Sequence, residues 1–109
     1  MKYLIEIDHP KSGAASTREE GRRFINEFIL PTLDELERLD GENRIVAGGP
    51  VAGRIALRFI IEVASPAELD QLLTRIRLWP IAESRITPLI DWADRRRHVE
   101  AILATLSAA

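Results

Sequence analysis

The stretch Gly53–Val63, GRIALRFIIEV, limits the possible fold more than any other part of the chain. With the two-residue period of a β-strand, one face is entirely apolar and carries Ile55, Leu57, Phe59, Ile61 and Val63. The opposite face carries Arg54, Arg58 and Glu62 between smaller or apolar residues. This pattern predicts a central strand with one face on a hydrophobic core and charged side chains on the other face.

The first half of the chain predicts a strand followed by a helix. KYLIEID (2–8) alternates and is typical of a strand, and HPKSGAA after it of a loop. Ser16 and Thr17 each precede a glutamate by three positions, so either can cap a helix. Pro31 falls inside the apolar pattern of that helix and should kink or split it, because proline lacks an amide donor.

The second half predicts three strands and two helices. AGGPVAG (47–53) is typical of a hairpin turn between two strands. SPAELDQLLTRI (65–76) predicts a helix with Ser65 as its N-cap, Pro66 at its first position and Glu68 closing a capping box. SRITPLIDW (84–92) predicts a last strand, in which Pro88 favours a sheet edge or a bulge. ADRRRHVEAILATL (93–106) predicts a C-terminal helix with an apolar stripe of Val99, Ile102, Leu103 and Leu106.

The order β-α-β-β-α-β plus a final helix predicts an α+β, ferredoxin-like fold in one domain spanning residues 1–109. In that fold the first and third strands are the central pair of an antiparallel four-stranded sheet, with both helices on one face. We expect Tyr3, Ile5 and Ile7 on the helix-covered face, beside the apolar face of the third strand. Glu6 and Asp8 should then lie beside Arg54 and Arg58 on the open face.

The composition excludes several classes of function. The 15 basic and 17 acidic residues nearly balance, which argues against a nucleic-acid surface. The chain has no cysteine, and its two histidines lack the spacing of a zinc site, so no metal is expected. The open face of the central strands offers Arg58 and Glu6 rather than aromatic rings, unlike an RNA-recognition module. No apolar run could span a membrane, and MKYLIEIDHP is too short and too charged for a signal peptide, so we expect a cytoplasmic protein.

SPAELDQLL followed by LWPIAESRITPL resembles a segment typical of the muconolactone isomerase family, and the likeness extends over about residues 28 to 92. The resemblance implies ferredoxin-like protomers that pair sheet to sheet as a dimeric α+β barrel. It also implies proton transfer within a small unsaturated lactone, in a pocket between sheet and helices, without a metal or organic cofactor. The sequence departs from that family before its third strand, where this chain reads RIVAGGPVAGR.

Three interpretations remain open for the charged face of the central strands. Glu6 and Arg58 lie on neighbouring strands and could form an ion pair, as could Glu62 with a nearby arginine, in a structural or interface network. Alternatively, Arg54 and Arg58 bind a small anionic ligand, because guanidinium groups match carboxylates in geometry. The third interpretation is ordinary solvent exposure.

An isomerase also needs a proton carrier. The candidates are Glu6 on the first strand, His9 at its end, and Glu27 on the first helix. Asp8 and Glu20 offer further carboxylates. Trp79 is a candidate pocket wall, although core packing is the more common role of such a residue, and Trp79 and Trp92 are both expected at the core or its edge. The alternative to an enzyme is a non-catalytic ligand-binding or structural homo-oligomer.

Overall fold

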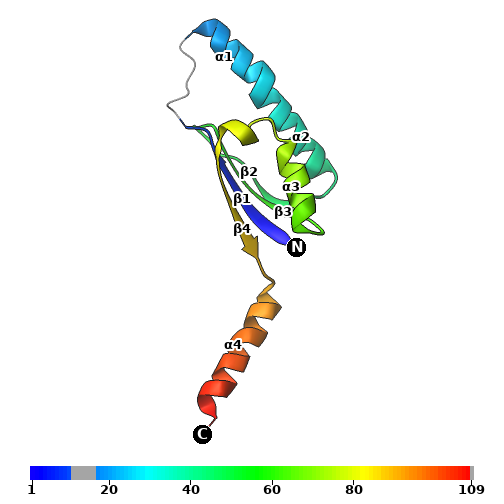
Figure 1. Cartoon of the computed structure of the whole chain (residues 1–109), viewed down its shortest axis with the longest axis vertical. Helices are drawn as coiled ribbons and strands as arrows, with labels where there is room; N and C mark the ends of the chain where they lie inside the picture. Colours follow the sequence, from blue (N-terminus) through cyan, green and yellow to red (C-terminus); the bar gives the residue numbers. More distant parts are fainter. Residues whose placement is uncertain (11–16, 109) are drawn as a thin grey trace.

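The computed structural model describes residues 1–10 and 17–108 (Figure 1). The four strands form one antiparallel sheet in the order β2-β3-β1-β4, so the predicted ferredoxin-like order and its central pair are confirmed. The elements are β1 (Lys2–Asp8), α1 (Arg18–Phe24), η2 (Ile25–Ile29), α2 (Leu30–Gly41), β2 (Ile45–Pro50), β3 (Ala56–Glu62), α3 (Pro66–Thr74), η3 (Trp79–Ile81), β4 (Glu83–Leu89) and α4 (Trp92–Ser107).

The elements α1, η2 and α2 form one long helical segment that crosses the sheet. Thr17 is its N-cap, since the Thr17 hydroxyl accepts a hydrogen bond from the Glu20 amide at 3.1 Å. Ser16, the other candidate cap, lies outside the described residues. The segment η2 is a π-helical turn, in which the Leu30 amide donates to the Ile25 carbonyl. This wide turn ends at Ile29, two residues before Pro31, so the distortion expected from the proline occurs in the turn before it.

The predicted hairpin between β2 and β3 is present, but its turn begins later than predicted, because residues 47–50 of the glycine-rich segment belong to β2. Gly48 lies opposite Phe59 and Gly49 opposite Arg58, and the turn comes later, at residues 51–55. Ile55 therefore falls outside β3 and is 44% exposed, in contrast to its predicted place on the buried face. The glycine composition suggested a turn, but an edge strand tolerates glycine wherever a bulge or a close backbone approach occurs.

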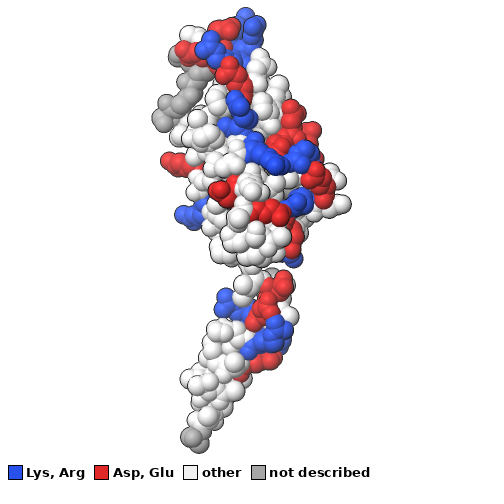
Figure 2. Space-filling view, turned by 45° about the vertical axis from the view of Figure 1, so that its right-hand side comes forward, with Lys and Arg blue, Asp and Glu red and all other residues white. Residues whose placement is uncertain are grey.

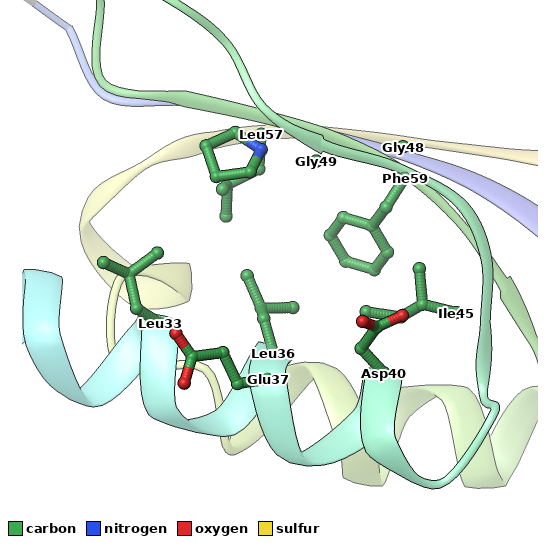
Figure 3. Close-up of a pocket in the computed structure, with 10 residues that line it drawn as sticks. Leu33, Leu36, Glu37, Asp40, Ile45, Gly48, Gly49, Leu57 and Phe59 are labelled. Carbon is green, nitrogen blue, oxygen red and sulfur yellow. The ribbon is translucent and has the colours of Figure 1, made fainter.

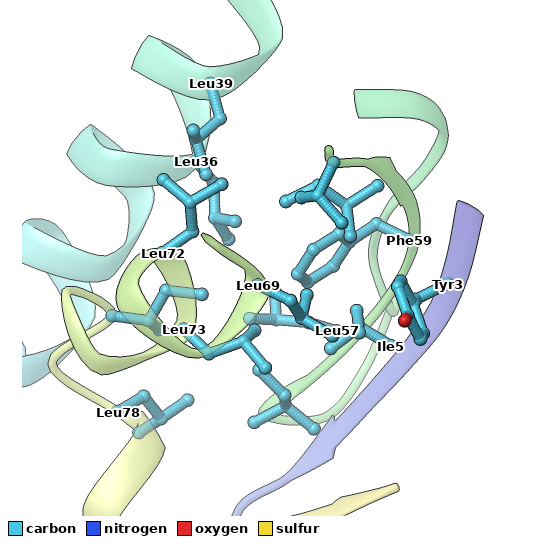
Figure 4. Close-up of a cluster of buried hydrophobic side chains, with 14 residues drawn as sticks. Tyr3, Ile5, Leu36, Leu39, Leu57, Phe59, Leu69, Leu72, Leu73 and Leu78 are labelled. Atoms are coloured by element: carbon cyan, nitrogen blue, oxygen red, sulfur yellow. The ribbon is translucent and has the colours of Figure 1, made fainter. Parts of the chain in front are cut away.

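One hydrophobic cluster fills the space between the sheet and the helices (Figure 4). Tyr3, Ile5 and Ile7 of β1 are buried there as predicted. Its other members come from α2, β3 and the residue after it, α3, and the segment after α3: Leu36, Leu39, Leu57, Phe59, Ile61, Val63, Leu69, Leu72, Leu73, Ile76 and Leu78. The buried Thr32 hydroxyl accepts a hydrogen bond from the Leu78 amide at 3.0 Å and joins α2 to this last segment.

Helix α3 begins as its sequence predicts. The Ser65 hydroxyl accepts a hydrogen bond from the Glu68 amide at 3.2 Å, and Pro66 occupies the first turn. The Glu68 carboxylate forms an ion pair with Arg44. The start of α3 is thus also tied to the chain just before β2.

Helix α4 extends away from the rest of the molecule (Figure 1). The radius of gyration is 18.5 Å, against about 13 Å for a compact chain of this length. Every described residue of α4 is exposed, and Trp92 at its start is 93% exposed, which is contrary to its expected place at the core or its edge. Within the part of the chain that the structure describes, no helix is long and apolar enough to cross a membrane.

Candidate functional site

Charged side chains gather on the open face of the sheet, where β1 and β3 lie side by side. The register places Glu6 opposite Arg58 and Asp8 opposite Ala56. Arg54 reaches the same end from the turn before β3. We call Glu6, Asp8, Arg54 and Arg58 the arginine–carboxylate cluster.

The guanidinium of Arg58 is held on several sides by protein groups. Its Nη2 donates to both carboxylate oxygens of Asp8, at 3.1 and 3.0 Å, and its Nη1 donates to the Leu57 carbonyl at 2.8 Å. Its Nε lies 3.4 Å from a carboxylate oxygen of Glu6, so the predicted pairing of these two residues is present. A second, incoming carboxylate would have to displace these partners.

Arg54 is less engaged than Arg58. Its Nη2 donates to Asp8 at 2.9 Å, and its side chain is 53% exposed. The carboxylate of Glu62, for which an arginine partner was expected, instead lies 3.2 Å from the N-terminal amine. Arg54 is therefore the arginine of the cluster that is more available to a ligand.

A hollow of about 350 Å³ lies next to the cluster, lined by Glu6, Asp8, Arg58, Glu83, Ser84 and Arg85. Its three carboxylates and two guanidinium groups nearly balance, which gives no strong preference for anions. Arg85 lies opposite Glu6 in the sheet and forms no ion pair with another described residue. This hollow fits a solvated or interfacial ion network better than a binding site for an organic molecule.

The remaining candidates from the sequence lie outside the cluster. The His9 ring lies 4.9 Å from the Phe24 ring, and the His9 amide donates to the Ile55 carbonyl at 3.0 Å. Glu27 is exposed on η2, and Trp79 is half-buried against the core at the start of η3. The structure thus brings together Glu6, Arg54 and Arg58 and leaves His9, Glu27 and Trp79 apart from them.

A second candidate site lies between α2 and the edge of the sheet formed by β2 (Figure 3). This pocket has a volume of about 220 Å³. Leu33 and Leu36 enter it from α2, and Leu57 and Phe59 from β3. Its other lining residues are Glu37, Asp40, Ile45, Gly48, Gly49 and Pro50. An apolar cavity with a few polar groups is the usual form of a small-molecule site.

The pocket continues along α2 into a second hollow of about 180 Å³, which shares Leu33, Pro50 and Leu57 with it. Arg54 lines this second hollow, whereas Glu37 and Asp40 line the first. We call the two hollows together the helix–sheet groove. The groove therefore has an apolar middle, with Arg54 among the residues at one end and Glu37 and Asp40 at the other.

The carboxylates of Glu37 and Asp40 have no ion-pair partner within the described residues. Arg38, the arginine next to them in the sequence, is engaged by two other glutamates. Arg38 forms ion pairs with Glu35 and Glu42, on another side of α2, and its hydrogen bond with Glu35 raises the pKa of its guanidinium further above its usual value. Glu37 and Asp40 form no ion pair with any described residue. They are exposed charges beside an apolar surface.

Gly48 shapes the strand that forms one wall of the groove. Its φ of +106° lies in a region that favours glycine, and a Cβ atom there would lie 2.1 Å from the Arg58 carbonyl oxygen. A bulge between Ile45 and Ala47 precedes it. The glycine–glycine pair is the sequence signal for this wall of the groove, although its composition predicts a turn. No local pattern marks Glu37 and Asp40 of α2 as part of the same site.

Comparison with known proteins bears on the fold. No protein-family model matches the chain, and comparison with curated proteins gives no match. Among solved structures, a crystal structure of muconolactone isomerase at 3.3 Å resolution matches with a TM-score of 0.64, over 84% of this chain and 90% of that chain. The chain has a muconolactone isomerase-like fold. This confirms the resemblance found in the sequence.

The likeness to muconolactone isomerase is one of fold alone, because the sequence identity is 16%. Chemistry has to be argued from the residues of this chain. Within residues 1–10 and 17–108, no group of three or more histidine or acidic side chains is placed to hold a metal ion.

Proposed function

We propose that this protein binds a small, oxygenated organic anion in the helix–sheet groove and moves a proton within it without a cofactor. The observation that carries the proposal is the arrangement of the groove, with Arg54 at one end and Glu37 and Asp40 at the other. The muconolactone isomerase-like fold supports it, since the enzyme of that name isomerises a small lactone.

Each part of the groove has a role in this proposal. The apolar middle, with Leu33 and Leu57, takes the hydrocarbon part of the ligand. Arg54 binds its carboxylate, since one contact with Asp8 leaves other N–H groups of the guanidinium to donate. Glu37 or Asp40 accepts a proton from one carbon and returns it to another.

This assignment differs from the proton carriers expected from the sequence. Glu6 lies on the open face of the sheet and faces Arg58, and Glu27 lies on η2. His9 contacts Phe24 at the end of β1. All three lie outside the lining of the groove, which makes them suitable comparison variants.

The test uses muconolactone as the probe. Binding is followed by chemical-shift changes of the groove residues, and proton transfer by deuterium uptake into the probe in D₂O. We expect Glu37→Gln or Asp40→Asn to abolish deuterium uptake while binding persists, and Arg54→Ala to weaken binding. Glu6→Gln, His9→Gln and Glu27→Gln should change neither.

Two results would contradict the proposal. If muconolactone and a series of small lactones and enol acids leave the groove resonances unchanged at millimolar concentration, the groove is not their binding site. If deuterium uptake is lost with Glu6→Gln, His9→Gln or Glu27→Gln but kept with both groove variants, the proton carrier is the one expected from the sequence.

A non-catalytic homo-oligomer is the second candidate, and the state of Arg58 favours it. Because Asp8, Glu6 and the Leu57 carbonyl of the same chain already engage its guanidinium, Arg58 is suited to a structural role on this face rather than to binding a ligand. The open face of the sheet also carries half-buried Leu4 and Ile60. Pairing of two such faces would form a dimeric α+β barrel.

In that case Ile60→Glu should convert a dimer to a monomer in light scattering. A wild-type monomer at micromolar concentration would contradict the homo-oligomer.

A further inference from the structure

The helix–sheet groove is longer than a compact lactone needs. Arg54 lines the hollow that also contains Ile29 and Leu33, whereas Asp40 lines the other hollow. Asp40 follows Leu33 by seven residues, which is about 10 Å along the axis of α2. In a five-membered lactone with an acetic acid arm, such as muconolactone, no ring atom is more than about 5 Å from the carboxylate carbon. A ligand of that size occupies only part of the groove when its carboxylate lies at Arg54.

The volumes of the two hollows lead to the same conclusion. The hollows measure about 220 and 180 Å³, and pockets for organic ligands usually start at about 300 Å³. Only the two hollows together reach that size. A ligand that fills the groove therefore extends from one hollow into the other.

Three apolar residues, Leu33, Pro50 and Leu57, line both hollows, and we call them the waist of the groove. Figure 3 shows Leu33 on α2 across the pocket from Leu57 on β3. The part of a ligand that crosses the waist should be apolar, because a polar group there would lose water without gaining a side-chain hydrogen bond. Leu57 belongs to the hydrophobic cluster, whereas Leu33 is only half-buried and lies outside it. The size of residue 33 can therefore change without disturbing the core.

The charge on the rest of the surface does not select a ligand. Acidic and basic side chains are interspersed on the face of the molecule shown in Figure 2. The net charge of the whole chain is only −2. A mixed surface of this kind does not concentrate anions over a wide area. The choice of ligand then depends on the groups inside the groove.

We propose that the substrate is an elongated acid, in which an apolar spacer of about four to six methylene groups separates the carboxylate from the oxygenated ring or enol. The carboxylate lies at Arg54, the spacer crosses the waist, and the reacting carbon lies beside Glu37 and Asp40. Leu33 is then a specificity-determining residue, because its side chain limits what can cross the waist. The inference rests on the proposed function, from which it takes the direction of the ligand, and it names a substrate class larger than muconolactone.

The test uses a homologous series of unsaturated five-membered lactones, in which one to eight methylene groups separate the ring from the carboxylate. Muconolactone is the first member of the series. Dissociation constants are measured by chemical-shift titration of the full-length protein, and proton transfer by deuterium uptake in D₂O. We expect the affinity to rise by up to about fourfold for each methylene group and to level off at about six, where the groove is full. Muconolactone should bind and exchange, but more weakly than these longer members.

Substitution of Leu33 tests the waist directly. Leu33→Trp should lower the ratio between the affinities for the six-methylene member and for muconolactone about tenfold, which corresponds to about two buried methylene groups. Leu33→Phe, a smaller change, should lower the same ratio less. Leu30→Trp is the matched control, because Leu30 is an exposed residue of α2 outside the lining of the groove, and it should leave the ratio unchanged. Circular dichroism verifies that each variant is folded.

Three outcomes would overturn the inference. The first is an affinity that is highest for muconolactone or does not change with spacer length. If deuterium uptake into muconolactone still depends on Glu37 or Asp40 in that case, the proposed function stands and only the elongated substrate fails. The second is an equal effect of Leu33→Trp and Leu30→Trp on the affinity ratio, and the third is a rise with spacer length in which Arg54→Ala weakens no member.

Other results bear on the proposed function separately. Absence of binding by every member of the series would overturn both the proposed function and the elongated substrate. Tight binding of the longer members without deuterium uptake would contradict proton transfer, while the spacer length and the role of Leu33 would stand.

Discussion

The guanidinium of Arg58 bridges both oxygens of the Asp8 carboxylate, at 3.1 and 3.0 Å, from the strand next to it. Arg54 donates to the same carboxylate at 2.9 Å, so Asp8 links two arginines. The sequence predicts that Glu6 and Arg58, on neighbouring strands, could pair, and the register places the two residues opposite each other. The shorter contacts, however, are with Asp8, two residues further along β1.

Substitution of Asp8 should lower stability modestly. Asp8→Asn removes a negative charge from between two arginines. Because the Arg58 and Asp8 side chains are each about one-third exposed, we expect a loss of about 1 kcal/mol in the free energy of unfolding. The measurement is urea denaturation at low salt. The difference from wild type should shrink in about 1 M NaCl, since salt screens exposed charges.

Arg85→Ala is the matched control for the Asp8 substitution, because Arg85 lies on the same face without an ion pair to any described residue. It should change the free energy of unfolding by less than about 0.5 kcal/mol. A larger loss for Arg85→Ala than for Asp8→Asn would mean that the cluster is not what stabilises this face.

Gly48→Ala should destabilise the protein strongly. The new Cβ atom would meet the Arg58 carbonyl at 2.1 Å, and the φ of +106° is strained for any residue but glycine. We expect a loss of at least about 2 kcal/mol, measured by denaturant or thermal unfolding. Gly49→Ala is the control, since a Cβ atom there meets nothing within 4 Å, and its effect should be small. Equal effects at the two positions would argue against the β2 register described here.

Thr32→Val tests the buried hydrogen bond between α2 and the segment after α3. Valine keeps the shape of threonine but leaves the Leu78 amide without its acceptor, which should cost about 1–3 kcal/mol. Thr74→Val removes an exposed hydroxyl that donates to the Gln71 carbonyl and should cost less than about 0.5 kcal/mol. Stability unchanged by Thr32→Val would show that water replaces the lost partner.

Ser65→Ala should remove the N-cap of α3 at a cost of about 1 kcal/mol in the free energy of unfolding. Ser65→Asp keeps an oxygen acceptor for the Glu68 amide and should retain most of the stability. Chemical denaturation of the two variants side by side checks this. If alanine and aspartate are equally destabilising, the cap contributes less than its geometry indicates.

The sequence by itself determined the elements whose signals are local. Alternation along β1 and β3 fixed which residues face the core, because side chains in a strand alternate strictly between two faces. Ser65 and Pro66 fixed the start of α3, because an N-cap needs only its own first turn. The ferredoxin-like order followed from these elements together.

Tertiary structure alone decided the properties that depend on segments distant in the chain. Gly48 and Gly49 lie in a strand because β3 pairs with them across a turn, although their composition is that of a turn. Asp8 became the partner of Arg58 and Arg54 through cross-strand geometry, which no local pattern contains. Likewise, Glu37 and Asp40 border a groove only because α2 packs beside β2. The apolar stripe of α4 is exposed because α4 leads away from the sheet. Local periodicity specifies which face of an element is apolar, but the packing of distant segments decides what that face meets.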